Sequence, residues 1–271
     1  MDDARRRRRR TDAGQCRSRP ASRLAGGSAA RRRGERRRRR GRPVVVTDPV
    51  TGPDDRCHVE PGGPALTLDL GDLTLTKVSV GPTDNNAYII AAPQGPVVLV
   101  DCAAEADRLT EVLGDRTVGV IVTTHQHPDH VRVLTEMAQR TGAALVCGTP
   151  DREAIRRRTG SGPDGRWDGD VIRCGDLELG VIGLVGHTPG SITLVVTPDH
   201  GPVHLLTGDA IFPGGLGRTT SPEDFATLFE DAAGKVFDRF GDDTMIHPGH
   251  GDSTTVGRER PHLGEWRARG W

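Results

Sequence analysis

The stretch that decides the fold is Thr124-His125-Gln126-His127-Pro128-Asp129-His130, which follows the apolar run Val118-Gly-Val-Ile-Val-Thr123. The apolar run predicts a buried strand, and a loop that leaves a buried strand can bring several side chains to one point. Within the segment Thr124 to His130, the side chains of His125 and His127 can bind one metal ion together. Asp129 and His130 begin the next helix and are displaced towards a second ion. Imidazole and carboxylate groups are both suitable zinc ligands.

Three further candidate ligands follow predicted strands later in the chain. They are His187 in Gly186-His187-Thr188-Pro189-Gly190-Ser191, Asp209 in Thr207-Gly208-Asp209-Ala210, and His250 in Pro248-Gly249-His250-Gly251. Each has glycine neighbours, which permit the tight turns that aim a ligand inward. Each alone is typical of a capping aspartate or a turn histidine. Together with the first cluster they supply two sets of three ligands and one bridging carboxylate.

The periodicity of the chain predicts the fold class α/β, and in particular two packed sheets with helices outside, an αββα sandwich. A helix is expected from Ser221, with Pro222 at its first position. Helices are also expected over 103–113 and from about Asp129 to Arg140. The predicted strands are 66–70, 73–80, 87–90, 97–100, 118–123, 144–147, 177–182, 192–196, 203–206 and 244–246.

Charge divides the chain into two unlike parts. Residues 1–42 hold 18 of the 37 basic residues and four of the 37 acidic ones, so they carry about +14 and the remainder about −14. This segment has too little apolar surface to offset the entropy of ordering, so we expect a disordered Arg-rich tail. Residues 43–64 are expected to form a linker or irregular lead-in, and residues 65–271 the catalytic domain. The tail is either a solvated extension without function or an arm for nucleic acid.

The sequence shows no sign of export or of membrane insertion. No apolar stretch of secretory-signal type follows the Arg tracts, and no apolar run approaches the roughly 20 residues of a membrane span. The five cysteines are scattered and not in CxxC spacing, and Cys102, Cys147 and Cys174 lie in or beside apolar runs. We expect these three cysteines to be small buried thiols rather than metal ligands or members of disulfides. A cytoplasmic location is expected.

The strings THQHPDH, GHTPGS, TGDAIF and PGHG, in this order, resemble the metallo-β-lactamase superfamily, and more closely its glyoxalase II-like hydrolases. The resemblance covers roughly residues 66–256 and implies the αββα sandwich. It implies a first ion held by His125, His127 and His187. It implies a second ion held by Asp129, His130 and His250, with Asp209 bridging both. His247 is a rival to His250, but only His250 stands between the two glycines of the motif.

The resemblance further implies two zinc ions about 3.5–4 Å apart that share a water whose pKa falls towards 7. Asp129 and Asp209 are then the catalytic carboxylates. Asp209 favours the thioester hydrolases, lactonases and phosphodiesterases of the superfamily, because true β-lactamases use other residues there. The segment around Arg218 resembles the GRT segment of the glyoxalase II-like and persulfide dioxygenase branches. Arg218 is therefore an expected substrate contact, and Tyr88 and the loop at 159–170 are the other walls expected for a substrate. A small acyl thioester is the expected substrate.

The end of the chain departs from glyoxalase II. That enzyme carries a helical C-terminal domain that binds glutathione, whereas only about 20 residues follow Gly251 here, enough for one short helix. Glutathione as the substrate's thiol is therefore in question. One alternative is a mononuclear iron persulfide dioxygenase that uses His125, His187 and Asp209. A further alternative is a lactonase, phosphodiesterase or nuclease, although the acidic core disfavours nucleic acid. No oligomeric state is predicted.

Overall fold

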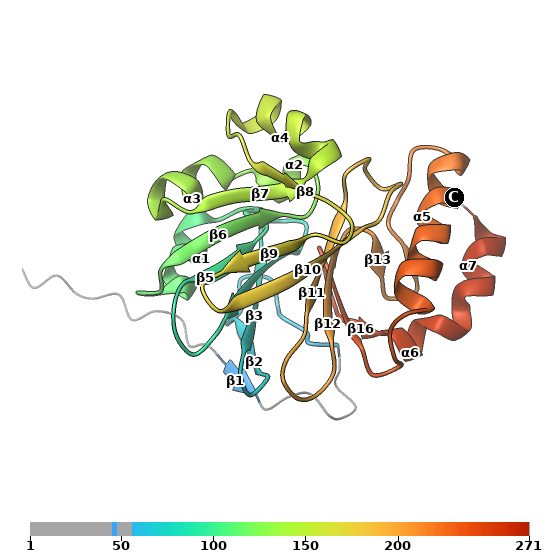
Figure 1. Ribbon diagram of the computed structural model, residues 1–271, viewed down its shortest axis with the longest axis horizontal. Helices are drawn as coiled ribbons and strands as arrows, with labels where there is room; N and C mark the ends of the chain where they lie inside the picture. The colour runs from blue at the N-terminus through green and yellow to red at the C-terminus, as the bar shows by residue number, and fades with distance from the viewer. Residues whose placement is uncertain (1–44, 48–55, 271) are drawn as a thin grey trace, which may run out of the picture. The chain divides into compact units, whose positions relative to one another are not determined.

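The computed structural model describes residues 45–47 and 56–270, and the predicted disorder of residues 1–42 lies outside this part of the chain. From residue 56 onward, two β-sheets pack face to face with helices on both outer faces (Figure 1). The predicted αββα sandwich is therefore confirmed. No helix of the described residues is long and apolar enough to cross a membrane.

The first sheet has eight strands in chain order, β1 to β8. Its pairing is antiparallel from β2 to β5 and parallel from β5 to β8. β1 lies in the segment expected to be an irregular lead-in, and it pairs in parallel with β2. The strands are Val45–Thr47, Leu66–Asp69, Thr74–Val80, Asn85–Ala91, Val97–Val100, Val118–Thr123, Ala144–Gly148 and Asp164–Arg166.

The second sheet has six strands in the order β16-β15-β12-β11-β10-β9, and a separate hairpin joins β13 to β14. β12 and β15 are parallel neighbours, so their carboxyl ends lie at the same edge. The strands β9 to β16 are Val171–Cys174, Leu177–Gly183, Ile192–Val196, His204–Gly208, Ile211–Phe212, Gly215–Leu216, Met245–Pro248 and Thr254–Thr255.

Seven α-helices cover the two outer faces. α1 to α4 accompany the first sheet, and α5 to α7 accompany the second (Figure 1). Their bounds are Ala106–Leu113, Pro128–Val131, Leu134–Thr141, Arg152–Thr159, Pro222–Ala232, Val256–Glu259 and Leu263–Arg269. α5 begins as predicted, with the Ser221 hydroxyl accepting a hydrogen bond from the Asp224 amide and Pro222 in the first turn.

Three apolar clusters hold the layers together. One lies between the sheets and joins residues of β2 to β7 with residues of β9 to β12. The second packs the first sheet against α1, α3 and α4, and the third packs the second sheet against α5 and α7. Cys102, Cys147 and Cys174 are buried free thiols, as expected. The rigid double sheet fixes the loops at the ends of its strands.

Two predicted helices differ in the structure. The single helix expected over residues 129–140 is divided into α2 and α3, because the Val133 amide donates to the Cys102 carbonyl at 3.1 Å instead of continuing the helix. The C-terminal residues form α6, a short 3₁₀ turn and α7 rather than one helix. Trp266 of α7 is buried edge-on against Phe237, with ring centroids 5.7 Å apart, and this contact holds α7 to the domain.

Candidate metal centre

The seven predicted ligands lie in four segments that follow strands at one edge of the sandwich. His125 and His127 lie in the loop between β6 and α2, and Asp129 and His130 lie in the first turn of α2. His187 lies in the loop between β10 and β11, Asp209 follows β12, and His250 follows β15. The structure brings all seven together in overlapping groups whose ligand atoms lie within 4.8 Å of one another: His125, His127 and His187; His125, His130 and Asp209; Asp129, His130 and His250.

The first group presents three ring nitrogens to a common point. Nε2 of His187 lies 3.3 Å from Nε2 of His125 and 2.8 Å from Nδ1 of His127. The far nitrogen of His187 donates to the Arg218 carbonyl at 2.7 Å, because a carbonyl can only accept. The Thr124 hydroxyl gives its one proton to Asp101, so it accepts the hydrogen bond from Nδ1 of His125 at 3.0 Å. Both rings therefore turn an Nε2 lone pair inward when they are neutral.

The second group is built in the same manner around the neighbouring point. Nε2 of His250 lies 3.3 Å from Nε2 of His130 and 3.3 Å from Oδ2 of Asp129. Nδ1 of His130 donates to Asp101 at 2.8 Å, and Nδ1 of His250 donates to the Thr83 carbonyl at 2.7 Å. These bonds fix the ring orientations and leave Nε2 of each ring for a metal.

Asp209 lies between the two groups. Its Oδ2 is 3.6 Å from Nε2 of His187 and 3.4 Å from Nε2 of His250. Its Oδ1 is 3.3 Å from Nε2 of His130, but it is buried and makes no hydrogen bond among the described residues. A carboxylate that faces imidazoles of both groups has the position of a bridging ligand.

The backbone beside Asp209 is shaped by glycine. A Cβ at Gly249 would lie 2.1 Å from Oδ1 of Asp209 and 2.7 Å from Cε1 of His130, so no side chain fits there. Gly208, directly before Asp209, has a φ of +51° and its Cβ would lie 2.7 Å from the Thr124 hydroxyl oxygen. The glycines next to these ligands thus permit a close approach of backbone and ligand.

The donor set fits divalent metal ions. Inward lone pairs of several imidazoles and a buried carboxylate oxygen without a partner repel one another unless a cation lies between them. Burial opposes a charge on His130, yet Asp101 and Asp209 raise its pKa to about 10. Burial likewise opposes ionisation of Asp209, but the facing rings of His130 and His250 hold its pKa far below the ordinary value. A cation is therefore favoured at this position, and a bound metal takes the place of the His130 proton.

Two buried carboxylates that the sequence analysis did not single out support the ligand loops. Asp101 follows β5 and accepts hydrogen bonds from His130 and from the amide and hydroxyl of Thr124. Asp151 follows β7 and accepts bonds from the amides of Gln126 and Gly190 and from the Thr188 hydroxyl. Asp151 therefore joins the first histidine loop to the loop that carries His187. Their common signal is a position just after an apolar strand.

The remaining predicted residues have different positions. Arg218 lines a cavity of about 420 Å³ together with His127, His187, Thr219 and Thr220. Tyr88 is 2% exposed, and its hydroxyl donates to the Pro248 carbonyl at 2.6 Å. Because the Tyr88 ring lies within the core, this structure gives it no contact with a substrate and instead places it beneath the His250 loop.

The rival histidine, His247, points away from the metal centre. Its ring is buried and stacks on His204, with Nε2 of His247 2.9 Å from Nδ1 of His204. Its Nδ1 lies 2.9 Å from the Ser253 hydroxyl. Both of its nitrogens are thus engaged with groups outside the cluster of predicted ligands, which contains His250 instead.

Comparisons with known proteins agree with the geometry. Residues 80–250 match the family model of the metallo-beta-lactamase superfamily. The chain is 29% identical over 213 residues to the hydroxyacylglutathione hydrolase GloC of Haemophilus influenzae, covering 69% of this chain and 95% of that protein.

Solved structures give the same result. The B3 metallo-beta-lactamase BLEG-1 superposes with a TM-score of 0.61 at 23% identity, covering 70% of this chain and 97% of that one. The di-iron-bound form of TTHA1623 superposes with a TM-score of 0.55 at 26% identity, covering 68% and 96%. From its fold, from the site at one end of the sandwich and from the family model, the chain belongs to the metallo-beta-lactamase superfamily.

Proposed function

We propose that this protein hydrolyses small acyl thioesters at a centre of two zinc ions. The observation that carries the proposal is the position of Asp209, with imidazoles of both ligand groups within 3.6 Å of its oxygens. In this proposal His125, His127 and His187 hold the first ion, and Asp129, His130 and His250 the second. Two such ions supply a hydroxide at neutral pH and polarise a carbonyl group.

The residues around the ions have separate tasks. Hydrogen bonding by Asn85 and the nearby rings of His130 and His250 lower the pKa of Asp129 against the effect of burial, so Asp129 is an anion at neutral pH. It can therefore accept a hydrogen bond from the nucleophile and orient it. Asp129 and Asp209 are accordingly the proposed catalytic carboxylates. Arg218 is the proposed contact for an anionic group of the substrate.

The lining of the metal-side cavity favours a thioester over other acyl substrates. Apart from the two metal-ligand histidines, its walls are Arg218, Thr219 and Thr220, none of which is a strong general acid. A thiolate leaves with little protonation because free thiols have a pKa of about 8.5. Amine and alkoxide leaving groups need a proton. A volume of about 420 Å³ also suits a small molecule rather than a polymer.

The relationship to GloC supports the same substrate class, since that relative is named a hydroxyacylglutathione hydrolase and is covered over 95% of its length. The metal is a separate question, because a related structure holds two irons. We propose zinc on the basis of the imidazole and carboxylate ligands. We further propose that residues 65–271 form the catalytic domain and that the protein acts in the cytoplasm.

The test is turnover of acetyl and lactoyl thioesters under anaerobic conditions by zinc-loaded protein, measured as release of free thiol. A lactone, a β-lactam and a phosphodiester are compared at equal concentration. Thioester hydrolysis without oxygen, with kcat/KM at least tenfold above the other substrates, is the expected result. Activity that requires oxygen and iron and yields sulfite from a persulfide would assign the protein to the mononuclear dioxygenases instead.

A further inference from the structure

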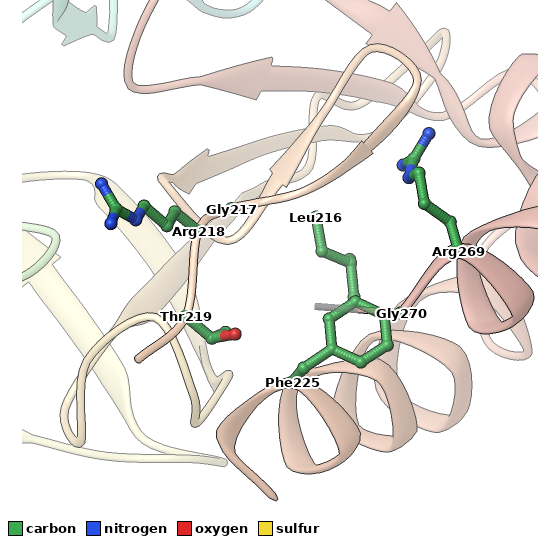
Figure 2. Close-up of a pocket in the computed structure, with 7 residues that line it drawn as sticks. All are labelled: Leu216, Gly217, Arg218, Thr219, Phe225, Arg269 and Gly270. Carbon is green, nitrogen blue, oxygen red and sulfur yellow. The ribbon is translucent and has the colours of Figure 1, made fainter. Parts of the chain in front are cut away.

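A second cavity adjoins the metal-side cavity and has no role in the reaction described above. Its volume is about 280 Å³, and it is lined by the segment Leu216 to Thr219, by Phe225 of α5 and by Arg269 at the end of α7 (Figure 2). Arg218 and Thr219 line both cavities. The two cavities therefore meet at this one short segment.

The segment between the cavities packs directly on the metal ligands. A Cβ at Gly217 would lie 1.6 Å from the carbonyl oxygen of Asp209 and 3.3 Å from Nδ1 of His187. The carbonyl of Arg218 accepts the hydrogen bond from that same Nδ1 at 2.7 Å. The wall between the two cavities is therefore one length of backbone. Because Arg218 and Thr219 line both cavities, a substrate that extends from the metal-side cavity past this segment enters the second cavity.

The second cavity combines an apolar wall with a positive charge. Leu216 and Phe225 are half-buried and supply the apolar surface. The exposed Arg269 donates one hydrogen bond, from Nη2 to the Gly214 carbonyl at 3.0 Å, and no carboxylate of residues 56–270 pairs with it. The nearby carboxylate of Glu259 is buried and is used by the Gly214 amide and the Thr254 hydroxyl.

The side chains of Arg218 and Arg269 point in different directions. Figure 2 shows the Arg218 side chain pointing away from Phe225 and Arg269, while its backbone lines the second cavity. Among residues 56–270, no aspartate or glutamate lines either cavity. A ligand that fills the second cavity would thus pass apolar side chains first and end beside the Arg269 guanidinium, which binds a carboxylate through paired N–H donors.

We propose that the second cavity binds the distal end of the substrate's thiol portion, a short apolar chain against Leu216 and Phe225 that ends in a carboxylate paired with Arg269. This assignment rests on the proposed thioester hydrolysis and names the substrate class within it. The residue that recognises the carboxylate, Arg269, is supplied by α7. Arg269 is a specificity-determining residue and takes no part in the chemical step.

The experiment uses two acetyl thioesters that differ only in charge, those of 6-mercaptohexanoate and of 6-mercaptohexanamide. For the wild-type protein, kcat/KM is expected to favour the carboxylate at least tenfold, chiefly through KM. Arg269→Gln should bring the ratio to within twofold. Arg267→Gln is the matched control, because it removes the same charge from the same helix at a residue that pairs with Glu230, and it should keep the preference. A ratio near one in the wild type, or a preference that survives Arg269→Gln, overturns the proposal.

A binding measurement separates this proposal from the proposed function. The thioether 6-(methylthio)hexanoate and its amide cannot be hydrolysed, and their binding to the metal-loaded protein is measured by calorimetry. Arg269-dependent binding of the carboxylate without turnover of either thioester would support the cavity assignment and refute thioester hydrolysis. Equal turnover of both thioesters, with equal binding of both thioethers, would refute the cavity assignment and leave the hydrolase function intact.

Discussion

Asp101→Asn tests whether the ring of His130 is oriented by a carboxylate outside the metal ligands. Asp101 is 1% exposed and accepts three hydrogen bonds, each of 2.8 Å, from the Thr124 amide, the Thr124 hydroxyl and Nδ1 of His130. Asparagine has the same shape but offers one acceptor and one NH₂ group. If the oxygen of the new asparagine accepts from the Thr124 amide, its NH₂ group faces the Thr124 hydroxyl and the Nδ1–H of His130. Donors then face donors. His130 can relieve this conflict by moving its proton from Nδ1 to Nε2. In that tautomer Nε2 has no free lone pair and can no longer bind a metal.

The size of the effect follows from this loss of one ligand. Removal of an outer partner of a metal-bound histidine weakens metal affinity or activity about 10- to 100-fold, which is about 1.4 to 2.7 kcal/mol. Because His130 is a proposed ligand of the second ion and not of the first, the second metal equivalent should be lost first. The first equivalent should be weakened less than the second, since His125 is linked to Asp101 only through the Thr124 hydroxyl, and His127 and His187 make no hydrogen bond to Asp101.

The assay is a competition of the zinc-loaded protein with a chelator, which resolves the two equivalents, combined with kcat for a thioester. Asp151→Asn is the matched control, since Asp151 is also a buried carboxylate that accepts three bonds, but none from a ring. It should lower the melting temperature without selective loss of the second metal. The reasoning is refuted if Asp101→Asn binds its second zinc within twofold of the wild type.

Three further predictions concern the ligand loops and the core. His250→Ala should reduce zinc to about one equivalent per chain, whereas His247→Ala should lower the melting temperature and keep both metals. The reverse pattern in metal analysis would reject the assignment of His250. Gly249→Ala should abolish metal binding and turnover because its Cβ would lie 2.1 Å from Asp209 Oδ1, while Gly264→Ala, with no atom within 4 Å, should leave zinc content unchanged. Retention of both metals in Gly249→Ala would speak against the tight bridging position. Burial lowers the pKa of His204 from its ordinary value of about 6.5 to about 4, so the unfolded chain binds more protons than the folded chain between these pH values. The stability that neutral His204 contributes above pH 6.5, about 3 kcal/mol, is therefore lost as pH falls towards 4. Melting curves from pH 7.5 to 4.5 should show a smaller decline for His204→Gln than for the wild type, and equal declines would contradict this.

The sequence predicted the double sheet and the grouping of the seven ligands because each ligand follows a strand whose apolar pattern is strong. It did not identify Asp101, since a lone aspartate after an apolar run carries no sign of the ring that it faces. The division of the helix after His130 was also missed. That division depends on a hydrogen bond from the Val133 amide to the Cys102 carbonyl, 31 residues earlier in the chain, and local helix propensity cannot show such a bond.

The walls of the substrate site were the least predictable part. The sequence predicts Tyr88 as one wall of the site, but its position on β4 buries it under the His250 loop. Nothing in the sequence pattern points to Arg269, because tertiary contacts such as Trp266 on Phe237 and Arg267 on Phe229 place the end of α7 beside the segment that carries Arg218. These contacts bring Leu216 and Arg269, 53 positions apart, into one cavity, and no local pattern encodes them.

The central claim is that Asp209 bridges two metal ions in this chain. Its most direct test is metal analysis of the wild-type protein and of Asp209→Asn, both purified without added metal and checked for an unchanged fold by circular dichroism. We predict two zinc equivalents per wild-type chain and clearly fewer than two in Asp209→Asn, together with loss of thioester hydrolysis. A single iron per wild-type chain, or two retained metals with normal turnover in Asp209→Asn, would contradict it.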